Sequence, residues 1–149
     1  MARSTNPDRF FSERERASID AAIKQAEGRT SAEIKLAVAR HCWTDLKTKA
    51  AALFRKLGLD KTAERNCVLI LLILTNREFL IYGDEGIHEK VGQAFWDDVR
   101  DLMANHFRND EFSQGLCGGV AMIGEKLARH FPRRPDDKNE ISDEVVYED

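Results

Sequence analysis

The feature that most restricts the fold is an uninterrupted apolar run, Cys67-Val-Leu-Ile-Leu-Leu-Ile-Leu74. Polar segments flank it, Asp60–Asn66 before it and Thr75–Arg77 after it. A run of this length between polar loops is typical of a strand buried on both faces at the centre of a sheet. It is too short to cross a bilayer as a helix, which takes about 20 residues. We therefore expect a domain built around this strand, and no membrane insertion.

The periodicity of the other apolar residues predicts further elements on both sides of this strand. Ser12 and Glu15 have capping-box spacing and begin a helix over 12–27, which Gly28 should end in the left-handed conformation. The remaining predicted elements are a strand over 33–39, a helix over 44–57, an antiparallel strand over 78–82, a helix over 87–103 that Gly92 interrupts, and a last helix that Asp110 caps and Pro132 ends. The order is α-β-α-β-β-α-α, so we expect an α/β fold, a three-layer α/β/α sandwich with a small mixed sheet.

The length predicts one domain over 1–132. The acidic segment 133–149 has little apolar area and is expected to be a C-terminal tail, extended or disordered. The last helix contains Gly115, Gly118, Gly119 and Gly124. Each glycine costs about 1 kcal/mol of helix propensity, and close approach of this helix to the sheet is the expected compensation.

Composition excludes several function classes. The formal charge of -3 and pI of about 5.8 argue against nucleic-acid binding, which favours a basic surface. The three cysteines are an odd number and have no CxxC spacing, which favours a reducing compartment. The first residues, Met1–Arg9, contain no apolar segment of a signal peptide. These observations predict a cytoplasmic protein.

Cysteine and histidine chemistry finds little support in the sequence. Gly115-Leu-Cys117-Gly-Gly119 matches the pattern of a nucleophile elbow, but that turn needs a preceding strand, and the flanks here are helical. No cysteine is followed by the arginine of a Cys-x5-Arg phosphatase loop. His41 lies beside Trp43 in a loop where we expect the tryptophan to be partly buried. The sequence therefore predicts no catalytic residue.

Acidic residues at predicted strand ends are the best candidate site. Glu33 begins one strand, whereas Asp84 and Glu85 follow another, so they share an edge only if those strands run antiparallel. Carboxylate oxygens are the ligands that calcium and magnesium prefer, so Glu33, Asp84 and Glu85 are candidate metal ligands. The alternative is that all three are ordinary solvated carboxylates.

An ordered set of short patterns resembles the TPM domain family. The matching patterns are Phe11-Ser-x-x-Glu15, Thr30-Ser-x-Glu33-Ile34, Thr62-x-x-Arg65-Asn66-x-Val68, Gly86-Ile87 before Trp96, and Phe131-Pro132 after Gly115-Leu116. The resemblance covers about residues 10 to 146 and implies a compact α/β/α sandwich. Its known relatives include a thylakoid-lumen protein described as a calcium-binding acid phosphatase, and a worm membrane protein that modulates an acetylcholine receptor. Many secreted relatives carry G-x-G-x-E-x4-D; here Gly83 and Glu85 match, whereas Ile81 and Lys90 replace the first Gly and the Asp.

Three functions follow as hypotheses. The first is a non-catalytic protein-interaction module, in which the acidic tail docks an unknown protein partner. The second is a divalent-metal-dependent phosphatase of low efficiency, with Glu33, Asp84 and Glu85 as ligands. The third is a calcium-binding domain without turnover.

Overall fold

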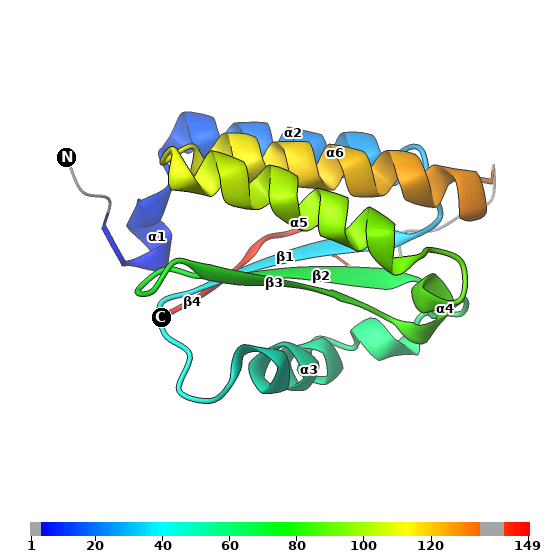
Figure 1. Cartoon of the computed structure of the whole chain (residues 1–149), viewed down its shortest axis with the longest axis horizontal. Helices are drawn as coiled ribbons and strands as arrows, with labels where there is room; N and C mark the ends of the chain where they lie inside the picture. The colour runs from blue at the N-terminus through cyan, green and yellow to red at the C-terminus, as the bar shows by residue number, and fades with distance from the viewer. Residues whose placement is uncertain (1–3, 135–141) are drawn as a thin grey trace.

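The computed structural model describes residues 4–134 and 142–149. Their strands form a mixed sheet in the order β3-β2-β1-β4, with helices on both faces (Figure 1). The strands are β1 (Glu33–Ala39), β2 (Cys67–Ile73), β3 (Glu78–Gly83) and β4 (Val146–Glu148). The helices are α1 (Pro7–Phe10), α2 (Glu13–Glu27), α3 (Leu46–Lys56), α4 (Glu85–His88), α5 (Gln93–Arg108) and α6 (Phe112–His130), with one 3-10 turn, η1 (Leu59–Lys61). The predicted α/β sandwich is confirmed.

The central position of the apolar run is also confirmed. Every residue of β2 is buried, and the strand lies between β1, which is parallel to it, and β3, which is antiparallel. Its alternate side chains fill two separate cores, because successive residues of a strand point to opposite faces. Val68, Ile70 and Leu72 pack with α2, α5 and α6, whereas Leu69 and Leu71 pack with α3.

Helices α2, α5 and α6 pack on one face of the sheet, and α3 packs on the other (Figure 1). The glycines of α6 make close contacts, but with neighbouring helices rather than with the sheet. A Cβ on Gly119 would lie 2.5 Å from Met103 of α5, and one on Gly124 would lie 2.7 Å from the Cβ of Ala26 in α2. The expected approach of α6 to the sheet was therefore wrong, and the glycines let α2, α5 and α6 pack side by side.

Local signals gave some helix boundaries correctly and others wrongly. The capping box of Ser12 and Glu15 is present, and Gly92 separates α4 from α5 as expected. Gly28, however, ends α2 with a right-handed backbone at φ -70°. Asp110 does not cap α6, since Glu111 holds the N-cap position and Asp110, at φ +62°, pairs with Arg77.

The C-terminal segment contributes a strand that the sequence did not predict. Val146–Glu148 form β4, which pairs in parallel with Ala37–Ala39 of β1. Lys49 binds the Glu148 carboxylate at 3.3 Å, and Arg40 pairs with Asp149. Residues 135–141 lie outside the described part of the chain.

Among the described residues, no helix combines the length and the apolar character that a membrane crossing requires.

Candidate functional site

The acidic residues predicted from sequence lie at the edge where β1 and β2 begin and β3 ends. Glu33 is the register partner of Cys67 in β2, and the Asp84 amide donates to the Cys67 carbonyl at 3.0 Å. Glu33 and Asp84 therefore flank Cys67 on neighbouring strands. The antiparallel relation of β1 and β3, on which their shared edge depended, is present.

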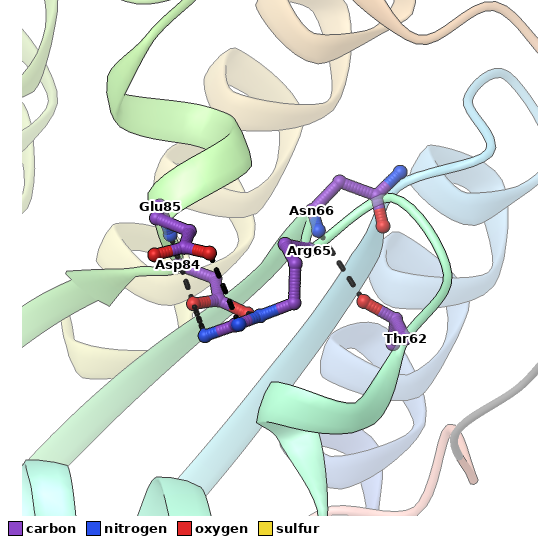
Figure 2. Close-up of polar contacts among 5 residues, drawn as sticks. All are labelled: Thr62, Arg65, Asn66, Asp84 and Glu85. Atoms are coloured by element: carbon purple, nitrogen blue, oxygen red, sulfur yellow. Dashed lines mark hydrogen bonds and ion pairs between the residues drawn. The ribbon is translucent and has the colours of Figure 1, made fainter.

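Asp84 is buried, with 6% of its surface exposed, and both of its carboxylate oxygens are bound (Figure 2). The Arg65 guanidinium donates from Nε to Oδ2 at 2.7 Å and from Nη2 to Oδ1 at 2.8 Å. Oδ1 also accepts from the Glu85 amide at 2.8 Å, so Asp84 caps α4. Two parallel charge-assisted hydrogen bonds make this the strong geometry of an arginine–carboxylate pair.

Arg65 is held in place by its own backbone and by Gly86. Its φ of +51° is unusual for a residue with a side chain. The Gly86 amide donates to the Arg65 carbonyl at 2.9 Å, and a Cβ on Gly86 would lie only 2.3 Å from the Glu64 carbonyl oxygen. The hydrogen bond to Asp84 raises the pKa of Arg65, so the guanidinium stays charged. Glu85, largely exposed, reaches Nη1 of the same guanidinium at 3.1 Å.

The loop before β2 is fastened to the start of β1. The backbone amide of the buried Asn66 donates a hydrogen bond to Thr62 Oγ1 at 3.3 Å (Figure 2). The Asn66 carbonyl accepts from the Glu33 amide, and the Asn66 side chain donates to Glu64. Arg65 thus sits on a loop that hydrogen bonds fix at both ends, which positions its guanidinium against Asp84.

A second polar cluster lies beside Glu33 and includes residues that the sequence reasoning missed. Glu27, at the end of α2, is buried, and its pKa is raised to about 10. Burial is the largest cause, followed by a hydrogen bond and repulsion with Asp143 and by repulsion with Glu33. Glu27 is therefore protonated at neutral pH and joins α2, β1 and the C-terminal segment.

Lys35 fastens the same segment from β1. Its Nζ donates to the Ser142 carbonyl at 2.9 Å and to the Glu144 carbonyl at 2.5 Å. The lysine is buried, and desolvation lowers its pKa although Glu144 and Glu27 oppose the shift. Nothing in the sequence indicated these backbone partners of Lys35, which lie more than a hundred positions away.

The predicted metal ligands do not fit a divalent cation in this arrangement. Arg65 and the Glu85 amide occupy the oxygens of Asp84, and Glu85 points to the same guanidinium. Across residues 4–134 and 142–149, no three or more His, Cys, Asp or Glu side chains are placed to hold a metal ion. Calcium takes six to eight oxygen ligands, so the arrangement would have to change before it could bind one.

Two of the three thiols, those of Cys67 and Cys117, are not activated as nucleophiles. Cys67 is buried, and desolvation together with Glu33 raises its thiol pKa far above the usual range. Desolvation also raises the pKa of Cys117, which lies inside α6 as the sequence indicated. Reactive cysteines need a lowered pKa, so these two stay protonated.

The loop after β1 differs from its prediction. Trp43 is 87% exposed rather than partly buried, and its ring stacks on His41 with centroids 4.8 Å apart.

A match between residues 4–126 and the model of the TPM domain decides the family. The chain belongs to the TPM domain family. Its fold is similar to the NMR structure of the BA42 protein from the psychrophilic bacterium Bizionia argentinensis, with 34% identity, a TM-score of 0.89, and coverage of 94% of this chain and 97% of that one.

Two further solved structures share the fold of this TPM domain. They are the N-terminal domain of a P. gingivalis protein (18% identity, TM-score 0.67, covering 83% and 82% of the two chains) and the N-terminal domain of the Corynebacterium glutamicum protein cg2496 (14%, 0.63, 78% and 74%). At these identities the likeness concerns the fold alone. No curated protein matches the chain.

Proposed function

We propose that this TPM domain is a non-catalytic protein-interaction module. The observation that carries the proposal is the two-point ion pair of Asp84 with Arg65. A carboxylate that acts on a substrate needs a free oxygen, whereas here both oxygens stabilise the fold by capping α4 and holding the loop before β2. Asp84, the best candidate for chemistry in the sequence, thus stabilises the fold in this proposal. The three free thiols agree with a reducing compartment, and we place the module in the cytoplasm.

The acidic tail was expected to dock the partner, and the contacts of its last residues change this part of the proposal. Its last residues are already used within the chain, because β4 pairs with β1 and the Glu148 and Asp149 carboxylates bind Lys49 and Arg40. A partner that binds this part of the tail would have to compete with β1. Deleting the whole tail would therefore remove a strand of the sheet as well as a docking segment, and would confound a binding assay.

Absence of turnover is the first test of the proposal. The purified chain should not hydrolyse para-nitrophenyl phosphate above the buffer rate with calcium, magnesium or manganese, at acidic or neutral pH. EDTA-sensitive turnover that Asp84→Asn removes, and that the surface variant Glu125→Gln retains, would overturn the proposal in favour of the phosphatase.

Binding is the second test. The full chain should capture a protein whose purified form then binds it saturably, with a defined stoichiometry, in a calorimetric titration. The same Asp84→Asn variant should retain this affinity, because the proposed role of Asp84 lies in the fold.

The alternative is a divalent-cation site for calcium or magnesium at Glu33, Asp84 and Glu85. What favours it is that Glu33 and Asp84 flank Cys67 at one edge of the sheet. Binding would require Arg65 to leave Asp84, so Arg65→Met should bind calcium more tightly than the wild type. In an NMR titration with calcium, amide shifts at these three residues would support the alternative if they are larger in Arg65→Met and absent in Asp84→Asn. The absence of shifts in every variant at millimolar metal would rule the alternative out.

A further inference from the structure

The two edges of the sheet are built differently. β4 is short, and its carboxylates pair with Lys49 and Arg40. β3 is twice as long, pairs with β2 residue for residue without a bulge, contains no proline, and has a charged residue only at its first position, Glu78. Figure 1 looks onto β3, and no helix or strand lies in front of it. β3 therefore lacks the devices by which proteins usually block an exposed edge strand.

The free hydrogen-bonding groups of β3 follow from its register. The Asp84 amide bonds to the Cys67 carbonyl, so this opposite pair is a hydrogen-bonded one. Such pairs alternate along an antiparallel ladder, which makes Tyr82, Leu80 and Glu78 the residues that bond to β2. The backbone groups of Phe79, Ile81 and Gly83 then point away from the sheet and can accept another strand.

Two adjacent hollows lie between this edge and α5, and they share Phe79. One has a volume of about 150 Å³ and the other about 350 Å³. The first is lined by Phe79, Leu80, Ile81, Gln93, Trp96 and Arg100, and the second by Arg77, Phe79, Ala104, Phe107 and Arg108. An added strand would place alternate side chains above them, since residues i and i+2 of a strand point to the same side.

The polar groups of the hollows select the kind of strand. Every charged residue that lines them is an arginine: Arg77, Arg100 and Arg108. Arg77 pairs with the exposed Asp110 and Arg100 with the partly exposed Asp97, and exposed ion pairs of this kind are weak and exchangeable. The indole N–H of Trp96, a side chain 9% exposed, finds no acceptor among the described residues. The arginines therefore give the hollows positive charge, and a strand that docks there should carry negative charge.

We propose that the β3 edge docks an extended acidic segment of a partner protein, which adds as a further strand beside Phe79–Gly83. Its alternate residues on the α5 side carry carboxylates to the three arginines, and its main chain bonds to the free groups of β3. The inference rests on the interaction function proposed above. A second copy of this chain is a poorer occupant, because pairing two β3 strands about an axis near Ile81 would bring both Arg100 side chains together.

The test uses the 15N-labelled full chain and two synthetic peptides as long as β3, one alternating valine with glutamate and the other valine with lysine. The glutamate peptide should shift the amides of Phe79, Ile81 and Gly83 and the Trp96 indole, and the lysine peptide should bind more weakly. Arg100→Glu should weaken the glutamate peptide about fivefold and strengthen the lysine peptide. Arg129→Glu is the matched control, since this arginine is also exposed and paired within its helix, and it should change neither affinity.

Several outcomes would overturn the inference. They are the absence of shifts at millimolar glutamate peptide, shifts confined to another surface, and equal binding of the two peptides. A dimer in sedimentation whose formation broadens the β3 amides would assign the edge to a second copy instead. A captured partner that binds Arg100→Glu with unchanged affinity would refute the edge and leave the interaction function standing, whereas metal-dependent turnover would refute the function itself.

Discussion

Replacing Glu27 by glutamine should make the protein more stable at high pH and leave its stability unchanged at low pH. Glu27 is 7% exposed, and its pKa in the folded chain is about 10 because of burial and of its contacts with Asp143 and Glu33. In the unfolded chain it titrates near 4.5. The folded state therefore binds one proton more than the unfolded state between these two values. Glutamine keeps the shape and the donor of the protonated acid but cannot lose a proton.

The sign follows from linkage. The folded pKa is raised, so the contribution of Glu27 to stability is fully present below pH 4.5 and is lost progressively as the pH rises toward 10. One proton difference corresponds to a limiting slope of about 1.4 kcal/mol per pH unit. Asp143 lines a solvent-open pocket beside Glu27, so screening weakens the repulsion that raises this pKa and shortens the pH window, whereas the slope inside the window is set by the one proton. The full slope over these three pH units gives about 4 kcal/mol, and a shortened window still leaves about 2 kcal/mol, so between pH 5 and pH 8 the wild type should lose at least about 2 kcal/mol relative to Glu27→Gln.

Thermal unfolding followed by circular dichroism at intervals between pH 5 and pH 8 measures this difference. For a chain of this size, about 2 kcal/mol corresponds to roughly 4 to 8 °C in Tm. Glu125→Gln, an exposed change on α6, controls for the loss of one negative charge and should follow the wild type. If the wild type and Glu27→Gln keep a constant difference in Tm over this range, Glu27 does not retain its proton on folding and the argument fails.

Three other changes test different contacts. Gly86→Ala should destabilise the protein by about 1–3 kcal/mol in urea unfolding, because its Cβ would meet a backbone oxygen at 2.3 Å. The control Gly118→Ala should be near neutral, because its Cβ would meet only the end of a leucine side chain at 3.0 Å. Equal losses of stability in the two variants would contradict the reasoning. Asp84→Asn should lower Tm at low salt by more than at high salt, since it keeps the helix cap but loses the ion pair. A salt-independent loss would contradict a contribution of this ion pair to stability. Lys35→Met should speed hydrogen exchange in residues 146–148 selectively, because it removes both bonds to the C-terminal segment, and uniform acceleration would mean that it destabilises the whole fold instead.

The parts of the fold that were predicted correctly depend on contacts between residues close in sequence. The central strand follows from its continuous apolar run, and the start of α2 follows from the capping box of Ser12 and Glu15. The wrong assignments at Gly28 and Asp110 were also local, and at Asp110 a distant contact decided the outcome. Asp110 pairs with Arg77 across the sheet edge instead of capping α6.

The candidate site was predicted only in part, for the same reason. The sequence identified Asp84 and Glu33 and the condition under which they share an edge. It gave no sign that Arg65, nineteen positions before Asp84, would bind both oxygens of that carboxylate. The pattern Thr62-x-x-Arg65-Asn66 was noticed as part of the family resemblance, yet a pattern in one sequence does not reveal the partner of a side chain.

The sequence by itself determined the fold class, the central strand, most of the helices and the absence of familiar catalytic motifs, because these follow from periodicity and from chemistry within a few residues. The tertiary structure decided which charges meet: Asp84 with Arg65, Glu27 with Asp143, and Lys35 with the carbonyls before β4. It also decided that β3 forms one edge of the sheet and β4 the other. The physical reason is that a charge acts over a few ångströms of space, and chain folding sets that distance independently of separation along the sequence.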